Sequence, residues 1–388
     1  MRSGASKTRV LTVITRLIVG GAQETAIDTC HLLDPERYEV DLLIGPQLGA
    51  EGELVSTVNR DRVRLTTLQP LVREIDPLND WRALRALEKI MRQGRYHIVH
   101  THSSKAGILG RMAARRARVP VVVHTVHGWP FHDRMNPLKR RVYIAAEKHC
   151  LPMTDKLIVV TQLDAGAGIR CGIGGPDDYR HIFSAINLDE YRNAAADPRA
   201  VRAALGLDPA APVAGCVARL SPQKAPDIFM RMAAEVARLV PDAQFLYVGG
   251  GPLRADIEAL IRELGLEGKV VLAGLRRDIP QLMAAMDVFA LLSLWEGLPR
   301  VFPQAMASGL PVVASRVGGA AEIVTHGDNG YLAEPGDWQT PAKHVAELLR
   351  DPALRRQMGE RGRQRVDPDF CVNHMVRQID ALYQELLR

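Results

Sequence analysis

Arg219 and Lys224 come just after a short apolar run of the sequence, residues 213–218. Cations at the end of a buried strand suit a phosphate-bearing ligand, because a planar guanidinium and a point-charge ammonium can both neutralise a diphosphate. Most cations in loops are only solvated, and the residue types alone leave that alternative open. The pair therefore indicates either a diphosphate site or an ordinary polar loop.

Two glycine clusters also follow apolar runs. Gly20-Gly21-Ala22 lies between the first apolar run and a helical pattern, and Gly249-Gly250-Gly251 follows the run 244–248. Glycine lets a backbone approach a ligand closely, and amides at a helix start favour anions. Neither cluster has the G-x-G-x-x-G spacing of a dinucleotide site, so a tight turn without a ligand is the alternative.

The most specific stretch spans residues 293–314. Glu296 and Gly297 follow the apolar run 288–291, and Pro299 fits the first turn of a helix, where proline is tolerated. We expect this helix start to bind an anion. The stretch continues through Gly309 into another apolar run.

Six of the twelve histidines lie between His97 and His132, which raises the alternative of a metal site. His100 and His102 would share one face of a strand, because side chains alternate along it. A catalytic metal would need further ligands, commonly a carboxylate, but Asp133 is the only acid between His97 and Arg141. We therefore expect histidines that are hydrogen-bonded locally, and no metal.

Apolar runs that alternate with helical patterns predict an α/β protein with parallel sheets. The break in the pattern at residues 189–208 predicts two domains, 1–188 and 189–388, and an amphipathic helix over 371–387 could pack across either of them. The predicted strands are 10–14, 40–44, 98–100, 121–125, 157–160, 213–218, 244–248, 270–272, 288–291 and 312–314. The predicted helices are 25–33, 81–93, 106–117, 139–150, 228–239, 253–264 and 342–349.

Composition narrows the functional class. The 388 residues are 47% hydrophobic and 24% charged, which is typical of a folded globular protein, and a net charge of +6 is too small to predict nucleic-acid binding. Residues 1–190 hold 27 Lys and Arg against 21 Asp and Glu. This surplus indicates either a solvated helix face or attraction to anionic lipid or a phosphorylated acceptor. It is concentrated at Lys105, Arg111, Arg115, Arg116, Arg118, Arg134, Lys139, Arg140 and Arg141.

The cysteines and the first apolar run indicate the compartment. Five cysteines lie far apart without a C-x-x-C pair, which fits a reduced cytoplasm. The apolar run 10–19 is interrupted by Arg16 and is much shorter than a membrane span of about 20 residues. We expect a cytoplasmic protein whose contact with a membrane, if it has any, is peripheral.

The stretch 293–314 resembles the signature of the retaining glycosyltransferases of family four, glycosyl transferases group 1. Four further segments stand in the order of that family: residues 20–24, 100–107, 127–128 and the Arg219/Lys224 pair. The resemblance spans about residues 10–335. It implies the GT-B fold, in which two Rossmann-like domains face each other across a cleft.

The resemblance also implies a donor site for a nucleotide diphosphate sugar. Arg219 and Lys224 would hold the diphosphate, with amides around Gly297 and Leu298, and Gly21 would approach the same phosphates from the other domain. The cluster around Gly250 would contribute to the same nucleotide site. The nucleotide base would be recognised by backbone groups around residues 274–277.

Two side chains would contact the sugar, and a third marks a departure from the family. Glu296 corresponds to the first of two family glutamates and would bind sugar hydroxyls, whereas His127 would contact the transferred sugar near its reacting carbon. The second glutamate is replaced by Gln304, which can still accept hydrogen bonds from the ribose through its carbonyl.

The resemblance implies an enzyme that transfers the sugar, with retention of configuration, to an acceptor hydroxyl. The basic surplus of the first domain favours a lipid diphosphate-linked sugar or a growing surface polysaccharide as the acceptor, and a soluble small acceptor is the alternative. Arg219 and Lys224 would stabilise the departing diphosphate without a metal cofactor. His102 and Lys105 would bind the acceptor. Two alternatives stay open: a nucleotide-sugar-binding protein with little or no transferase activity, and an epimerase of the same fold.

Overall fold

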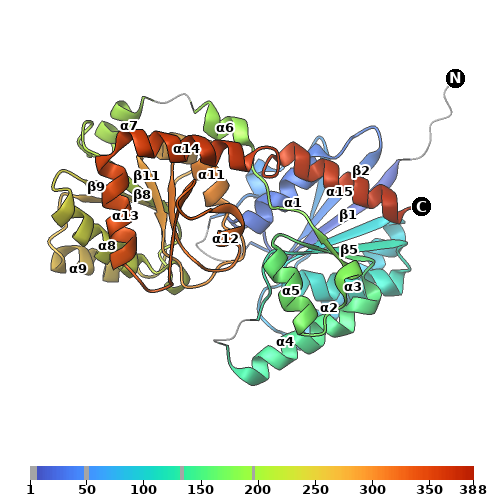
Figure 1. Cartoon of the computed structure of the whole chain (residues 1–388). Coiled ribbons are helices and arrows are strands. Elements are labelled where there is room, and N and C mark those ends of the chain that lie inside the picture. Colours follow the sequence, from blue (N-terminus) through green and yellow to red (C-terminus); the bar gives the residue numbers. More distant parts are fainter. Residues whose placement is uncertain (1–6, 48–51, 132–134, 195–196) are drawn as a thin grey trace. The chain divides into compact units, whose positions relative to one another are not determined.

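The computed structural model of the chain describes residues 7–47, 52–131, 135–194 and 197–388. It consists of two compact units (Figure 1). The first unit contains residues 1–184 together with 372–388, and the second contains residues 185–371. Both are built on parallel β-sheets, as the alternation of apolar runs and helical patterns predicts.

The sheet of the first unit has seven strands among the described residues, in the order β3-β2-β1-β4-β5-β6-β7. All of its strand pairs are parallel. The chain order reverses between β1 and β4, which are neighbours in the sheet. The strands are β1 (Thr8–Ile14), β2 (Tyr38–Ile44), β3 (Val63–Thr67), β4 (Ile98–His102), β5 (Val121–Val126), β6 (Lys156–Val159) and β7 (Tyr179–His181).

Helices cover both faces of this sheet. Leu11, Leu43 and Val99 point to one face, where they pack against α2 and α3. His100 points to the other face, toward α15. The helices of the unit are α1 (Gly21–Leu32), α2 (Pro77–Gly94), α3 (Ser104–Ala117), α4 (Pro137–Cys150), α5 (Gln162–Arg170) and α15 (Val372–Leu386).

The second unit has a six-stranded parallel sheet among its described residues, in the order β10-β9-β8-β11-β12-β13. Here the chain order reverses between β8 and β11. Aromatic edge contacts join the sheet to its helices, as between Phe229 and Tyr247, whose ring centroids are 5.5 Å apart. The strands are β8 (Val213–Val217), β9 (Gln244–Val248), β10 (Val270–Gly274), β11 (Val288–Leu291), β12 (Val312–Ser315) and β13 (Gly330–Ala333).

The helices of the second unit include several that the apolar pattern did not predict. α14 is one of them, because six of its fifteen residues are charged and only four are buried. The helices are α6 (Leu188–Arg192), α7 (Pro198–Ala204), α8 (Pro226–Leu239), α9 (Arg254–Glu263), α10 (Ile279–Ala284), α11 (Val301–Ala307), α12 (Ala320–Ile323), α13 (Gln339–Arg350) and α14 (Pro352–Val366).

The C-terminal helix corrects the expected domain division. We assigned residues 189–388 to the second domain, but α15 packs in the first unit, beside α1 (Figure 1). Tyr383 hydrogen-bonds His100 of β4 at 2.6 Å, and Asp380 accepts a bond from the Tyr38 hydroxyl at 2.5 Å. The apolar side of α15 therefore completes the core of the first unit.

Candidate active site

The predicted donor residues of the second unit lie where the chain order of the sheet reverses. β8 and β11 are adjacent there, with Phe289 opposite Gly215. Lys224 follows β8, and Glu296 follows β11. Open α/β sheets bind ligands at the carboxyl ends of strands at such a reversal, because the loops diverge and leave room between them. The strand order thus puts these two loops side by side at a ligand-binding position.

Lys224 and Glu296 form an ion pair across this position. The Lys224 ammonium contacts Oε1 of Glu296, and their side chains are 19% and 7% exposed. Gln223 joins the same loops. Its side-chain Nε2 donates to the Trp295 carbonyl at 2.9 Å, and its backbone carbonyl accepts from the Leu294 amide at 2.9 Å. The loops after β8 and β11 therefore hold a cation and a carboxylate together, and both side chains are mostly buried.

Arg219 is exposed, and the backbone of the next residue, Leu220, is held by the glycine cluster after β9. The Leu220 amide donates to the Gly250 carbonyl at 2.9 Å. Gly251 has a φ of +155°, and a Cβ there would lie 2.3 Å from the Leu220 carbonyl oxygen. Only glycine fits so close to this loop. A Cβ at Gly250 would meet no atom within 4 Å, so Gly250 borders open space beside Arg219.

The segment after β11 corrects the expected helix start. α11 begins at Val301 instead of Pro299 and has only seven residues. Gly297 and Leu298 therefore lie before the helix, and the Gly297 carbonyl accepts a 2.7 Å bond from the Gly319 amide. Their amides belong to the loop that leads into α11 and not to the first turn of the helix. Gln304 lies half-buried on α11.

In the first unit, the predicted residues also flank the reversal of chain order. Gly21 begins α1 just after β1, and His102 ends the neighbouring strand β4. The hydroxyls of Thr15 and Ser103 are 2.8 Å apart and join the two loops. Each unit therefore brings its predicted residues to the ligand-binding edge of its own sheet.

The histidines of β4 and β5 are mostly structural. His100 contacts the Tyr383 hydroxyl at 2.6 Å and the Thr125 hydroxyl at 2.7 Å. His124 lies 2.9 Å from the Thr101 hydroxyl on the opposite face. Burial lowers the pKa of His100 to about 3 and the pKa of His124 well below its usual value, so both are neutral at pH 7.

His102 and His127 form a separate pair. Nδ1 of His102 lies 2.9 Å from Nε2 of His127, and the two rings are stacked with centroids 5.2 Å apart. The His102 side chain is fully buried, so the predicted direct contact with an acceptor does not fit its position behind His127. No group of three or more His, Cys, Asp or Glu in the described part of the chain could hold a metal ion; His132 lies outside that part.

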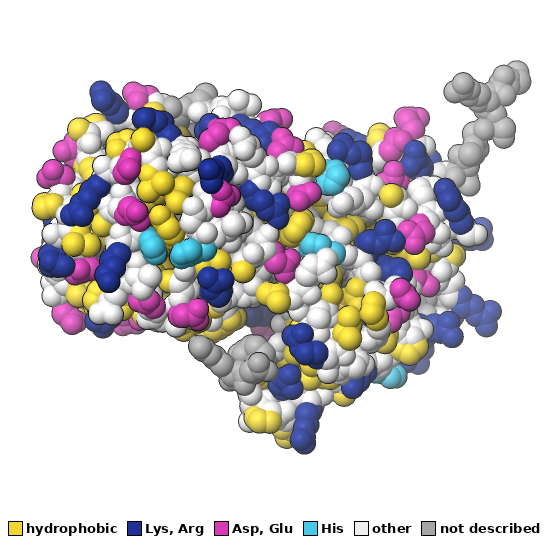
Figure 2. Space-filling view, viewed as in Figure 1, with side chains coloured by type: hydrophobic (Ala, Val, Ile, Leu, Met, Phe, Trp, Pro, Cys, Tyr) yellow, Lys and Arg dark blue, Asp and Glu magenta, His cyan; other side chains and the backbone are white. Residues whose placement is uncertain are grey.

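The side chains of Lys105 and Arg111 are less exposed to solvent than the run of basic residues in the sequence indicated. Lys105 pairs with Asp80 at 2.6 Å, and its side chain is 13% exposed, which disfavours the predicted contact with an acceptor. Arg111 is fully buried and pairs with Glu147 at 2.7 Å. Lys139 and Arg141 on α4 are exposed, and Figure 2 shows basic and hydrophobic side chains interspersed in this region. Arg134 lies outside the described residues.

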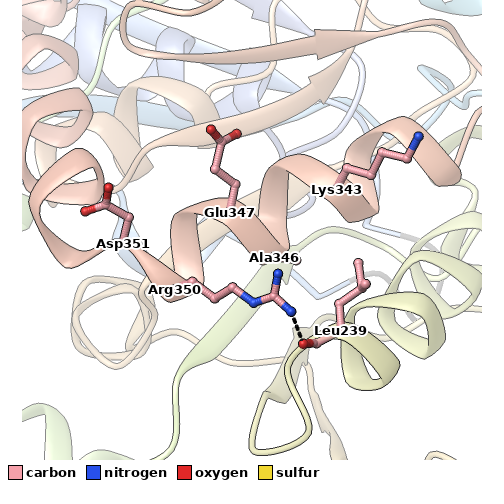
Figure 3. A pocket seen from close by; sticks show the side chains of 6 residues that line it. All are labelled: Leu239, Lys343, Ala346, Glu347, Arg350 and Asp351. Carbon is pink, nitrogen blue, oxygen red and sulfur yellow. Dashed lines mark hydrogen bonds between the residues drawn. The ribbon is translucent and has the colours of Figure 1, made fainter.

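One surface pocket lies away from all of these residues. It has a volume of about 570 Å³ and runs along α13, where Arg350 bonds the Leu239 carbonyl (Figure 3). Its lining is Leu239, Lys343, Ala346, Glu347, Arg350 and Asp351. No predicted site residue lines this pocket.

Comparison with known proteins agrees with the division of the chain into two units. Residues 20–180 match the family described as glycosyl transferase 4-like domain, and residues 198–365 match glycosyl transferases group 1. The chain is 32% identical, over its full length and 99% of the relative, to an Escherichia coli galactosyltransferase named for UDP-Gal and GlcNAc-diphosphoundecaprenol. The chain belongs to the group 1 glycosyltransferases.

Other similar proteins share the activity class and the fold. A D-inositol 3-phosphate glycosyltransferase from a Mycobacterium species is 35% identical over 68% of this chain and 62% of its own length. The solved structure of Anabaena HepE in complex with UDP and glucose superposes with a TM-score of 0.84 at 25% identity, covering 97% of this chain and all of that one. This glycosyltransferase therefore has the GT-B fold of two Rossmann-like domains.

Sequence reasoning missed several residues that shape these sites. Gln223 joins the loops after β8 and β11, and Thr15 and Ser103 join the loops after β1 and β4. Gln223 stands between Arg219 and Lys224, so its position in the motif was a usable signal. No signal in the sequence reveals the Thr15–Ser103 bond, because it depends on β1 and β4 being neighbours.

Proposed function

We propose that this glycosyltransferase moves a sugar from a nucleotide diphosphate sugar to a hydroxyl of a lipid diphosphate-linked sugar, with retention of configuration. The Lys224–Glu296 pair at the reversal between β8 and β11 carries the proposal. This pair places two groups at the carboxyl ends of adjacent strands: a cation that would bind phosphate and a carboxylate that would accept hydrogen bonds from sugar hydroxyls. UDP is the first nucleotide to test, because HepE was solved with UDP and with UDP-glucose.

In the proposed reaction, the bond between the anomeric carbon and the diphosphate oxygen breaks, and a bond from the acceptor oxygen to that carbon forms. The acceptor's proton goes to the departing diphosphate on the same face of the sugar. Negative charge grows on the diphosphate during this step, so fixed cations lower the barrier. Arg219 and Lys224 would supply this charge together with loop amides around Gly297, and we propose that no metal is needed.

The remaining residues would orient the sugar. Glu296 would leave its contact with Lys224, or share it, to accept hydrogen bonds from donor hydroxyls. His127, at the end of β5, would contact the transferred sugar. Gly21 would contribute its amide at the start of α1, where the helix dipole favours phosphate.

The donor assignment is tested by adding nucleotides and nucleotide sugars to the protein and measuring its melting temperature, since a ligand of the folded state raises it. UDP or a UDP-sugar should raise the melting temperature. Lys224→Ala and Arg219→Ala should each lower turnover roughly 10²- to 10³-fold with the fold retained. Arg238→Ala is the matched control, because Arg238 is an exposed cation on α8 paired only with nearby Glu235.

Two results would contradict this assignment. Unchanged turnover in Lys224→Ala or Arg219→Ala would remove that residue from the donor site. A nucleotide sugar that binds without being transferred or hydrolysed, with any acceptor tried, would favour the alternative of a nucleotide-sugar-binding protein.

We propose further that the outer face of α4 contacts an anionic membrane, where a lipid-linked acceptor would be found. Leu138 and Val142 are one turn apart and are 71% and 60% exposed. Lys139 and Arg141 lie beside them, and the one acid of α4, Glu147, is buried against Arg111. Apolar side chains flanked by cations suit the interface of an anionic bilayer. No helix of the described residues is long and apolar enough to span a membrane.

Flotation with vesicles tests this surface. The protein should float with vesicles that contain phosphatidylglycerol and remain behind with pure phosphatidylcholine. Leu138→Glu/Val142→Glu should abolish flotation and leave transfer to a detergent-soluble acceptor unchanged. Leu32→Glu, at an exposed leucine of α1, is the control. Flotation of the double variant at the level of the unmodified protein would reject the α4 surface.

A further inference from the structure

The His102–His127 pair has a feature that its burial does not explain. Nε2 of His102 is buried, and no hydrogen-bond partner for it exists among the described residues. Its other ring nitrogen, Nδ1, lies 2.9 Å from Nε2 of His127. His102 thus makes one side-chain hydrogen bond, and that bond goes to the histidine at the end of the neighbouring strand.

This asymmetry selects a tautomer. A neutral imidazole has one N–H and one lone pair. A buried N–H without an acceptor is rarer in proteins than a buried acceptor without a donor, because the unmade donor bond is costly. The hydrogen of His102 therefore belongs on Nδ1, where it donates to His127. The His127 ring must then keep a lone pair on Nε2 and carry its own hydrogen on Nδ1.

The surroundings hold His102 in this orientation. Its ring lies against that of His100, with centroids 4.3 Å apart and planes tilted by 33°, and His100 is fixed by the hydroxyls of Tyr383 and Thr125. The residue after it, Ser103, has a φ of +62°, an uncommon backbone conformation for a residue with a Cβ. Ser103 keeps this conformation with its hydroxyl 2.8 Å from that of Thr15. Such strain persists where neighbouring bonds fix it.

We propose that His102 is a positioning residue that fixes the tautomer and ring orientation of His127, so that His127 acts on the donor sugar as an Nδ1–H donor. This inference rests on the proposed function for the role of His127 in sugar transfer. Its statement about the tautomer stands on the geometry of the first unit alone. A hydrogen-bond donor in a fixed direction orients a sugar hydroxyl without an ordering cost at each turnover.

Nuclear magnetic resonance of ¹⁵N-histidine-labelled protein tests the tautomer without any activity measurement. His127, assigned from the signals lost in His127→Gln, should show a lone-pair shift at Nε2 and an N–H shift at Nδ1. In His102→Phe, which keeps a ring in the stack but has no donor, this preference should disappear. A hydrogen on Nε2 of His127 in the unmodified protein, or the same tautomer in His102→Phe, would overturn the proposal.

Kinetics test the positioning role. His102→Phe should lower kcat roughly tenfold, the effect of one lost hydrogen bond in the transition state, with the donor KM within about twofold. His102→Asn should recover most of the loss, because the asparagine amide nitrogen takes the place of Nδ1. His124→Asn is the matched control: it alters a buried histidine on the opposite face of the sheet and should leave kcat unchanged.

Equal losses in His102→Phe and His102→Asn, or a similar loss in His124→Asn, would show a purely structural role and overturn the proposal. If the unmodified protein transfers no sugar, the proposed function fails by itself. The resonance measurement then still decides whether His102 fixes the tautomer of His127.

Discussion

At the scale of single residues, Gln304 is a neutral side chain at a position where the family resemblance implies an acid. It lies half-buried on α11, and its backbone carbonyl accepts from the Ser308 amide and hydroxyl. A carboxylate would turn a neutral hydrogen bond with the nucleotide ribose into a charge-assisted one, worth about 1 kcal/mol more.

We predict that Gln304→Glu strengthens the binding of UDP about fivefold, measured by isothermal titration calorimetry. Gln357→Glu adds the same charge at an exposed position of α14 and should leave binding unchanged. Weaker binding in Gln304→Glu, or an equal gain in both variants, would mean that residue 304 does not face the ribose.

The buried histidines make a prediction about pH. His100, His102 and His124 have pKa values lowered by burial, the first to about 3, whereas an unfolded histidine titrates near 6.5. Below about pH 6.5 the unfolded chain binds protons that the folded chain does not. As the pH decreases below about 6.5, the free energy of unfolding should therefore decrease by roughly 1 kcal/mol per pH unit for each of the three histidines, until the folded pKa values are reached.

Urea unfolding between pH 7 and pH 5 measures this slope. His124→Asn removes one of these titrating groups and should reduce the slope by roughly 1 kcal/mol per pH unit, whatever its effect at pH 7. A slope that is unchanged in this variant would show that His124 titrates with the same pKa in the folded and the unfolded state.

At the scale of elements, a buried ion pair links α3 to α4. The Arg111 guanidinium contacts Glu147 at 2.7 Å and donates through Nε to the Gly107 carbonyl at 2.9 Å, and both side chains are almost fully buried. Removing one partner leaves a buried charge uncompensated, whereas replacing both with apolar residues removes the desolvation cost as well.

We predict that Arg111→Met lowers the free energy of unfolding by about 3–5 kcal/mol, whereas Arg111→Met/Glu147→Leu restores most of it. Urea denaturation of the two variants gives both values. If the double variant were less stable than the single one, the pair would stabilise the α3–α4 contact beyond its desolvation cost.

At the scale of the whole molecule, the chain passes twice between the two units, after Ser184 and after Cys371. Both crossings lie close together on the second unit, where the Ile186 amide donates to the Phe370 carbonyl at 3.0 Å. The last segment of the chain thereby returns to the first unit and covers β4 with Tyr383.

We predict that ending the chain at Cys371 destabilises the first unit selectively, because the truncation exposes His100 and the apolar residues under α15. Hydrogen exchange followed by mass spectrometry should show faster exchange in β1 and β4 and unchanged exchange in β8 and β11. Removing only residues 387–388 is the control. Uniformly faster exchange in both units would contradict a local role of α15.

The amino-acid pattern alone was enough to find the strands that are buried on both faces: β9 and β11 are almost entirely apolar, and β1 and β5 are apolar runs with a few polar residues. It also showed which charged side chains the loops after β8 and β11 carry, because Lys224 and Glu296 keep their residue types wherever they lie. It did not reveal β3, whose residues are mostly exposed, or α14, whose pattern is mostly polar.

Only the tertiary structure decided which residues meet. Strand order places β8 beside β11 and β1 beside β4, and this neighbourhood joins Lys224 to Glu296 and Thr15 to Ser103. Tertiary packing also placed α15 in the first unit. It buried Arg111, which the sequence indicated as part of a basic surface, and His102, which the sequence indicated as a residue that binds the acceptor. The physical reason is that burial and pairing depend on contacts between distant segments, whereas a local pattern records only periodicity and residue type.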